Sequence, residues 1–424
     1  MGHHEARPWR RVVVTGLGAI TPLGLNIPET WDGLVNGRSG IARITQWDPT
    51  GYPTQFAGEV KGFDPTKFMS FKEARRMARC SQLAVATAKE ALDDSGLGDI
   101  SGEADRVGVL MGTAIGGFDF ALQGIQTIAE KGFARLSPFA IPESLANMPA
   151  HHISLHYGAK GFNNTVVTAC AAGTQAVGEA MEAIQRGRAE VILAGGVEAM
   201  LMTPHCIMGF SAMRGLSRRN DDPAGASRPF DKDRDGFVVG EGCGVLVLEE
   251  LSHAQARGAA IYAEVKGYAA SSDAYDVAEP DPEGAGAVRA MRWALEDAGV
   301  APAQIDYINA HGSSTPKGDA IETMAIKKFF GERAYNIPIS STKSMVGHSF
   351  GGTGAIEAIS CVQAIRYQTI HPTINYHTPD PLCDLDYVPN VARKTRVQHT
   401  LSNSFGLGGQ NACLVMAEYS EGEA

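Results

Sequence analysis

Hydrophobic residues fall into short β-branched runs that alternate with longer amphipathic stretches along the chain. Each short run is stopped by glycine or by polar residues, which is typical of a buried strand. The longer stretches, 79–94 and 173–186, carry apolar residues at helical spacing, and Gly96 and Gly187 follow them where helices commonly stop. Alternating strands and helices predict an α/β fold built in layers. The clearest strand candidates are 11–16, 106–111, 191–196, 244–248, 305–310 and 337–340.

The two halves of the chain resemble one another. Residues 88–97 match 291–300, each a helix that ends in glycine and is soon followed by a strand. A weaker match pairs 173–177 with 352–356, in the same order. Self-similarity at this long separation predicts a duplicated domain and not a solenoid. We therefore predict an N-terminal half over 1–255 and a C-terminal half over 256–424, packed as one body.

Length, charge and cysteine usage narrow the class of protein. The 424 residues are 44% hydrophobic, which allows a large core, and the formal net charge is -10. That charge argues against nucleic acid as a partner, since phosphate binding needs a basic face. No apolar run reaches the length of a membrane span, so no membrane partner is expected. The seven cysteines are scattered without a paired-cysteine motif, which predicts a reduced, cytoplasmic protein.

One cysteine differs from the others in its position. Cys170 stands where a strand, 165–168, gives way to a helix, with the small residues Ala169, Ala171 and Gly173 around it. The positive end of a helix dipole favours a thiolate, so we expect a lowered pKa and a more nucleophilic sulfur. Small neighbours leave room for a thioester to approach. Taken alone, however, a cysteine between alanines is more often an ordinary packed core residue.

Two histidines strengthen the interpretation of Cys170 as a nucleophile. His311 and His348 each lie in a glycine-bearing loop that follows a predicted strand, which is where α/β sheets present ligands. A single histidine beside glycine is compatible with a structural role. Two such histidines together with a cysteine at a helix start form a three-part pattern for nucleophilic catalysis.

These three segments resemble the signature of the β-ketoacyl-acyl-carrier-protein synthases. The nucleophile turn at 168–173, the histidine loop at 309–316 and the lysine–histidine loop at 343–348 match that family's motifs. The resemblance runs from the first strand to 402–409, and the segments 228–237 and 370–375 are most similar to the synthase II branch. It implies a thiolase-like five-layered αβαβα duplication with two mixed sheets, usually assembled as a homodimer.

The resemblance also implies an acyltransferase reaction. Cys170 would take an acyl chain from acyl carrier protein (ACP), malonyl-ACP would lose CO2, and the enolate would attack the acyl-cysteine. The products would be β-ketoacyl-ACP, CO2 and free ACP, in fatty acid elongation. His311 and His348 would donate hydrogen bonds to the developing oxyanion of the malonyl thioester. The backbone N–H groups of Cys170 and Phe405 would form a second oxyanion hole, with Phe405 also acting as a gate.

Further roles are carried over from the family by position. Lys343 would support the histidines electrostatically, paired with Glu322. Asp319, Thr315 and Ser313 would belong to the same supporting shell, and Ile115 and Phe210 would lie along the acyl tunnel. No cofactor is required, but the resemblance implies a structural K+ or Na+ near Asn309, Ala310, Glu357, Ser402 and Asn403. For ACP docking we expect a basic patch at the mouth of the site that includes Arg214, Arg218 or Arg219.

Departures from the family pattern cluster around the gate and tunnel. Ser313 replaces a threonine, Leu407 replaces the second phenylalanine of the gate, and Phe350 to Thr353 replace a leucine-rich continuation. These changes leave the preferred acyl chain open. Three alternatives remain: the same chemistry in a polyketide or specialised lipid pathway, a non-catalytic chain-length factor, and a thiolase. Chain-length factors lack the cysteine, and thiolases need a second catalytic cysteine, for which Cys413 is poorly placed.

Overall fold

The computed structural model describes residues 9–421, and its two halves repeat one strand order. In the first half the order is β5-β4-β6-β7-β1, and in the second it is β10-β9-β13-β14-β8. In both halves the first three strands are parallel and the last two run antiparallel to their neighbours. The strands are β1 (Val12–Ile20), β4 (Val107–Gly112), β5 (Asn163–Val166), β6 (Val191–Glu198), β7 (Gly242–Glu250), β8 (Ala263–Ser272), β9 (Tyr307–Asn309), β10 (Ile339–Ser340), β13 (His399–Gly406) and β14 (Gln410–Ala417).

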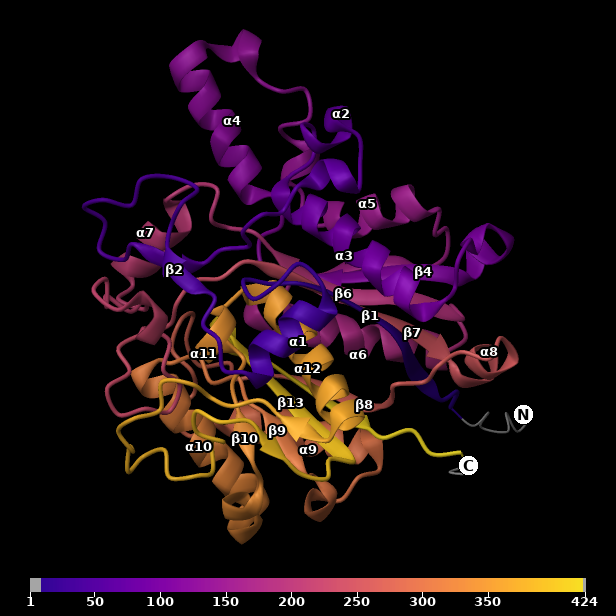
Figure 1. Cartoon of the computed structure of the whole chain (residues 1–424), viewed down its shortest axis with the longest axis vertical. Helices are drawn as coiled ribbons and strands as arrows, with labels where there is room; N and C mark the ends of the chain where they lie inside the picture. The colour runs from indigo at the N-terminus through magenta and orange to yellow at the C-terminus, as the bar shows by residue number, and fades with distance from the viewer. Residues whose placement is uncertain (1–8, 422–424) are drawn as a thin grey trace.

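The helices complete five layers (Figure 1). Helices α6 (Ala172–Gln185) and α12 (Thr353–Tyr367) contact each other and the strands of both halves, so they form the middle layer. Helices α3 (Arg79–Ser95) and α5 (Met148–Tyr157) cover the outer face of the first half. Helices α9 (Ala285–Ala298) and α10 (Pro316–Phe330) cover the outer face of the second. The predicted layered duplication is confirmed.

The two mixed sheets that we predicted are joined at one edge. Two residue pairs between β1 and β8, Val13 with Glu264 and Val14 with Ala263, link them into one ten-stranded ladder within the described residues. At the same point β1 has an irregularity in its pairing with β7, between Val14 and Gly16. Beyond that point the two halves separate around the middle helices.

The strand and helix predictions agree closely with the structure. The apolar runs at 191–196 and 244–248 lie in β6 and β7, those at 11–16 and 106–111 overlap β1 and β4 in all but their first residue, and those at 305–310 and 337–340 include the shorter β9 and β10. The helix predicted over 79–94 is α3, which ends at Gly96 in a left-handed conformation with φ +67°. That conformation favours glycine, as the sequence indicated.

The middle helices meet at their N-terminal ends through two glycines. A side chain at Gly173 would lie 2.6 Å from the carbonyl oxygen of Gly351, and one at Gly354 would lie 2.4 Å from the backbone nitrogen of Thr174. Only glycine allows this close approach. The contact brings the start of α6 beside the loop before α12, and these are the segments that carry Cys170 and His348.

The remaining elements surround this core. Helix α4 (Phe118–Lys131) projects at the top of Figure 1, near α2 (Phe71–Ala74). No helix within residues 9–421 is long and apolar enough to cross a membrane. The other elements are α1 (Ile27–Val35), α7 (His205–Ala212), α8 (Leu251–Ala256), α11 (Lys343–Val346), β2 (Ile41–Arg43), β3 (Phe56–Gly58), β11 (Thr369–Ile370) and β12 (Arg393–Lys394).

Candidate active site

Cys170 lies in a short 3-10 turn, Ala169–Ala171, that leads directly into α6. Ala169 has φ +50°, a left-handed conformation that non-glycine residues rarely adopt and that is common at functional turns. Burial raises the pKa of the thiol to about 11, against the opposing effects of the Leu407 N–H group and of Lys343. The lowered pKa that we expected from the helix start is therefore wrong, because desolvation of the sulfur outweighs the groups that favour thiolate.

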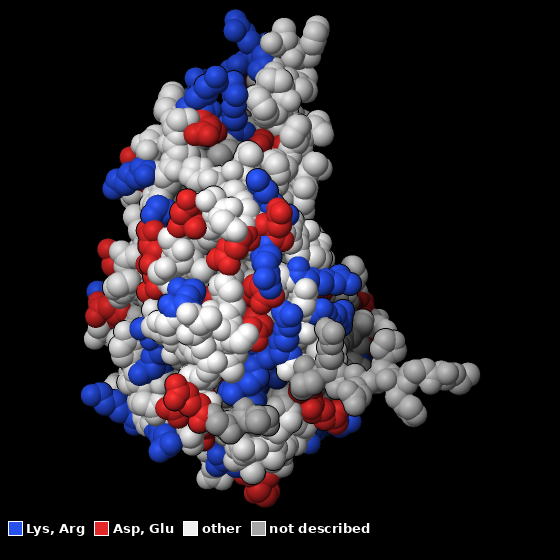
Figure 2. Space-filling view, turned by 90° about the vertical axis from the view of Figure 1, so that its right-hand side faces the viewer, with Lys and Arg blue, Asp and Glu red and all other residues white. Residues whose placement is uncertain are grey.

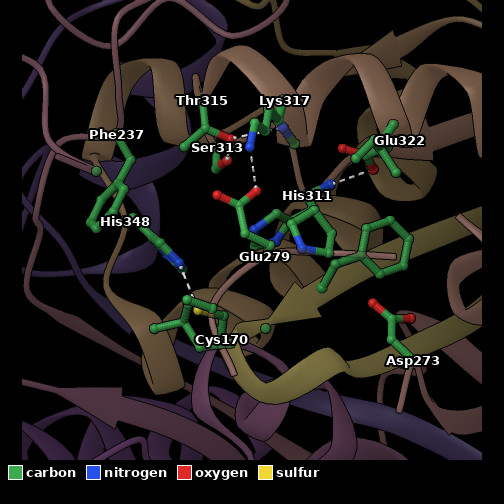
Figure 3. A pocket seen from close by; sticks show the side chains of 18 of the residues that line it. Cys170, Phe237, Asp273, Glu279, His311, Ser313, Thr315, Lys317, Glu322 and His348 are labelled. Atoms are coloured by element: carbon green, nitrogen blue, oxygen red, sulfur yellow. Dashed lines mark hydrogen bonds and ion pairs between the residues drawn. The ribbon is translucent and has the colours of Figure 1, made fainter. Parts of the chain in front are cut away.

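His348 contacts the sulfur directly. Its Nε2 lies 3.0 Å from Cys170 Sγ, as the dashed line in Figure 3 shows. On the other side of the ring, the backbone N–H of Phe350 donates to Nδ1 over 3.3 Å. Because Nδ1 accepts that bond, the ring hydrogen resides on Nε2 and points toward the sulfur. Burial, followed by the positive charge of Lys343, holds the pKa of His348 well below its usual range, so the ring is neutral.

His311 stands next to His348, with ring centroids 5.4 Å apart and planes at 84°. Its loop is fixed by Glu322 on α10, whose two carboxylate oxygens accept the backbone N–H groups of His311 and Gly312 at 2.8 and 2.7 Å. Burial, Lys343 and His348 hold the pKa of His311 well below its usual range. The site therefore presents two neutral imidazoles on one side of the sulfur.

Lys343 binds a different carboxylate from the one we predicted. Its ammonium lies 2.5 Å from Glu357 Oε1 and 2.5 Å from the carbonyl oxygen of His311. Glu322 does not pair with it, because the backbone of the His311 loop already occupies both Glu322 oxygens. Lys343 still supports the histidines electrostatically, since its charge lowers the pKa of both rings.

Asp319, Ser313 and Thr315 support the His311 loop. Asp319 is buried and accepts the backbone N–H groups of Phe230 and Ser314 at 2.7 and 3.0 Å. Thr315 caps α10 by accepting from the Gly318 N–H, and its hydroxyl lies 3.1 Å from that of Ser313. Both residues line the cavity in front of Cys170.

A cavity of about 510 Å³ opens in front of the sulfur. Cys170, His311, His348, Phe405 and Phe210 line it, so the structure brings these predicted residues together. Ile115, which we also predicted to lie along the acyl tunnel, is outside the lining and is 37% exposed. Lys317 and Glu279 form an ion pair with a nitrogen–oxygen distance of 2.9 Å. The pair lies across the cavity from Cys170 (Figure 3).

Three buried oxygens lack partners among the residues for which the resemblance implied a cation. Asn309 Oδ1, Glu357 Oε2 and Ser402 Oγ are buried and meet no hydrogen-bond partner among the described residues. Buried polar atoms are rarely left unsatisfied, and an unseen ion is one reason for them. Oxygen donors of this kind suit hard cations, a class that includes the K+ or Na+ implied by the resemblance. Three of the five residues thus fit the ion, and one of them, Glu357, also binds Lys343.

Two domain models of a known protein family match the chain. The N-terminal domain of the beta-ketoacyl synthases matches residues 9–254, and the C-terminal domain matches residues 262–377. The chain belongs to the β-ketoacyl synthase family. It is 53% identical over 411 residues to a 3-oxoacyl-[acyl-carrier-protein] synthase 2 of Synechocystis, covering 97% of this chain and 98% of that one. A protein of the same description from Coxiella burnetii is 47% identical, covering 96% and 98%.

Solved ketosynthase structures share this fold. The ishigamide ketosynthase/chain length factor superposes with a TM-score of 0.91, and a beta-ketoacyl synthase from Burkholderia phymatum with 0.89. A type II polyketide ketosynthase in complex with its acyl-carrier protein gives 0.88. Each is 37% identical and covers 97% of this synthase and 100% of its own chain.

Several residues of this synthase site were not singled out in the sequence. Phe237 lines the cavity, and the Leu407 N–H group acts on the sulfur. Glu198 is fully buried at the end of β6 and accepts the backbone N–H of Ala114 at 2.5 Å. A glutamate at the end of a predicted buried strand could have been noticed in the sequence, whereas the role of a backbone N–H group leaves no signal there. Cys413, the candidate thiolase cysteine, is buried in β14 and bonds Asn403 instead.

Proposed function

We propose that this synthase catalyses the decarboxylative condensation of acyl-ACP with malonyl-ACP in fatty acid elongation, through an acyl-Cys170 intermediate. The observation that carries the proposal is the placement of Cys170 under two neutral imidazoles at one end of a single cavity. A nucleophile, two hydrogen-bond donors and a space for the chain are the parts that this reaction needs.

The first step is acyl transfer to sulfur. Cys170 Sγ attacks the thioester carbonyl, the new sulfur–carbon bond forms, and the bond to the ACP sulfur breaks. The proton of Cys170 leaves with the departing ACP thiol. The Leu407 N–H and the Nε2–H of His348 stabilise the charge on Cys170 as it reacts. The oxyanion donors for this step are the backbone N–H groups of Cys170 and Phe405.

The second step uses the histidines. Once the sulfur is acylated, Nε2–H of His348 and the ring of His311 donate to the thioester oxygen of malonyl-ACP. The carbon–carbon bond to the carboxylate breaks, CO2 leaves, and its electron pair forms the enolate. The enolate carbon attacks the acyl carbon, the bond to Cys170 sulfur breaks, and the released Cys170 thiolate takes up a proton from solvent. Neutral imidazoles suit this task, because they donate hydrogen bonds without needing a proton from solution.

Purified protein, malonyl-ACP and acyl-ACPs of graded length provide the test. Mass spectrometry of the ACP products should show β-ketoacyl-ACP two carbons longer than the acyl donor. Cys170→Ala is the matched negative control, because it removes only the sulfur from a buried position. Unchanged acyl-ACP with the wild-type protein would overturn the proposal.

A fatty acid pathway is favoured over a polyketide pathway by degree of likeness. Identity to the two bacterial proteins described as 3-oxoacyl-[acyl-carrier-protein] synthase 2 is 53% and 47%. Identity to the type II polyketide ketosynthase structure is 37%. A chain-length factor is disfavoured because Cys170, His311 and His348 all stand in the cavity.

We further propose that ACP docks on basic side chains around the cavity. Arg214 lines the mouth and is exposed, Arg218 is exposed nearby, and Arg219 is held by the carbonyl oxygen of Asp233. Local positive charge of this kind can attract an acidic partner despite the net -10. Figure 2 shows a separate group of Lys and Arg at the end of the molecule that carries α2 and α4. Arg214→Glu should raise the KM for acyl-ACP and leave kcat nearly unchanged.

A homodimer is the assembly we propose. A set of exposed apolar side chains on and after α4 supports it, with Ile125 63%, Phe133 84% and Ile141 71% exposed. Such clustered exposure marks a protein interface more often than a free surface. The strand β5 at the edge of the sheet leaves further backbone groups available for pairing. Light scattering after size exclusion should give twice the chain mass, and Ile125→Asp should weaken the dimer.

We also propose that the oxygen atoms of Asn309, Glu357 and Ser402 hold a monovalent cation, K+ or Na+, with Ala310 and Asn403 completing the site. A bound ion stabilises the folded state. The melting temperature should therefore be higher in KCl or NaCl than in choline chloride at equal ionic strength, and Ser402→Ala should reduce that difference.

The seven free cysteines fit a reducing compartment such as the cytoplasm.

A further inference from the structure

Three phenylalanine rings from distant segments form one wall of the cavity beside Cys170. Phe350 stacks on Phe210 with centroids 5.1 Å apart and planes at 18°. Phe237 meets both rings edge-on, at 5.2 and 5.8 Å. Phe350 also stacks on the imidazole of His348 at 4.6 Å. The wall is therefore continuous with the catalytic histidine.

Phe350 is held in place by its backbone. It is 3% exposed and has φ +41°, an uncommon conformation for a bulky residue. The next residue, Gly351, donates its N–H to the buried carboxylate of Glu198 at 3.3 Å. Glu198 also accepts from Thr113 and Ala114, so it ties the loop of Phe350 to the end of β4. Strain retained beside a reacting group indicates a functional constraint.

An apolar region lies behind this wall. Cys170 and Phe350 belong to one hydrophobic cluster with Met200, Leu201 and Ile207. Those three side chains do not line the cavity, whereas Phe210, Phe237 and Phe350 do. The rings thus separate the cavity from an apolar region that borders the nucleophile. An acyl chain too long for the cavity has to displace the rings to enter that region.

We propose that Phe350, stacked on Phe210, sets the length of acyl chain that Cys170 accepts. This inference rests on the proposed condensing activity and names the residue that selects its acyl substrate. Short chains fit in the cavity with the wall closed. Long chains react only when the Phe350 ring moves away from Phe210 and His348, so their reaction costs the free energy of both ring contacts. A leucine, which the related motif carries near this position, has no ring to stack and opens the wall.

The test compares the rates at which acyl-ACPs of graded length, from butanoyl to tetradecanoyl, acylate Cys170 in intact-mass measurements. In Phe350→Leu the ratio of the tetradecanoyl rate to the butanoyl rate should rise by about tenfold or more, the scale on which small changes in an apolar pocket discriminate substrates. Phe330→Leu is the matched control: the same substitution in a buried position, 7% exposed and in edge-on contact with Phe329, outside the cavity lining. Its ratio should equal that of the wild type.

A second variant guards against misfolding. Phe210→Leu removes the other ring of the stack from a half-buried position and should raise the same ratio. If Phe350→Leu and Phe210→Leu both fold, as circular dichroism reports, and change all chain lengths by one common factor, the inference is overturned. An absence of acyl-Cys170 in the wild type at every length would instead overturn the proposed function, so the two failures are distinguishable.

Discussion

The ammonium of Lys343 and the carboxylate of Glu357 lie 2.5 Å apart, and both side chains are almost fully buried. Breaking a buried pair leaves one charge without its partner in an apolar setting. Lys343 lies in α11 and Glu357 in α12, so the pair joins these two helices near the loops of His311 and His348. Its consequences for stability and for the histidines can be measured separately.

In a buffer without K+ or Na+, Lys343→Met should destabilise the fold by about 3–5 kcal/mol, since Glu357 is then buried with neither its ammonium partner nor a cation. Chemical denaturation followed by circular dichroism measures the change. The double variant Lys343→Met/Glu357→Gln should recover a large part of that loss, because no charge is then stranded. A single variant that costs less than about 1 kcal/mol, the usual worth of an exposed pair, would contradict the buried pairing.

The same lysine should shape the pH profile of malonyl-ACP decarboxylation. Its charge lowers the pKa of His311 and His348, so both rings stay neutral well into the acidic range. In Lys343→Met both pKa values should rise, and protonation at Nδ1 of His348 would oppose the Phe350 N–H bond. The acidic limb of the profile should therefore move to higher pH. An unmoved limb in a folded variant would show that Lys343 does not act on the histidines.

Cys170 should alkylate slowly at neutral pH and faster as the pH rises. Its thiol pKa is raised to about 11, so the reactive thiolate is a small fraction at pH 7 and grows about tenfold per pH unit below that pKa. Iodoacetamide modification followed by peptide mass spectrometry gives the rate. A rate that levels off near pH 7 would mean that the thiolate is far more stable than burial allows.

His311→Ala should lose decarboxylation while Cys170 still accepts an acyl chain. Removing one donor to a developing oxyanion typically costs about 2.7–4 kcal/mol, or a hundredfold to a thousandfold in rate. CO2 release from malonyl-ACP measures the loss, and His311→Asn, which keeps an N–H donor, should recover part of it. Wild-type CO2 release from His311→Ala would remove His311 from this role.

The sequence was sufficient to predict the duplicated layers and the cavity residues with local signatures. Each of Cys170, His311 and His348 follows the carboxyl end of a strand, and all three line one cavity. Gly96 also follows a predicted helix, and in the structure it ends that helix in the left-handed conformation that glycine favours.

Features that depend on contacts between distant segments could not be predicted from the sequence. Lys343 lies within electrostatic reach of both Glu322 and Glu357, and only the orientation of the His311 loop decides which one it binds. The raised pKa of Cys170 depends on burial by many segments, not on the turn that carries it. The stack of Phe210, Phe237 and Phe350 joins three segments whose proximity is a property of the whole fold.

The most direct measurement of the central claim is peptide mass spectrometry of the protein after incubation with acyl-ACP alone. The mechanism predicts one acyl group per chain, located on Cys170, present in His311→Ala and absent in Cys170→Ala. Cys170→Ala should retain its fold and still release CO2 from malonyl-ACP, because both imidazoles remain. An acyl group on another residue, or on Cys170→Ala, would contradict the assignment of Cys170 as the nucleophile.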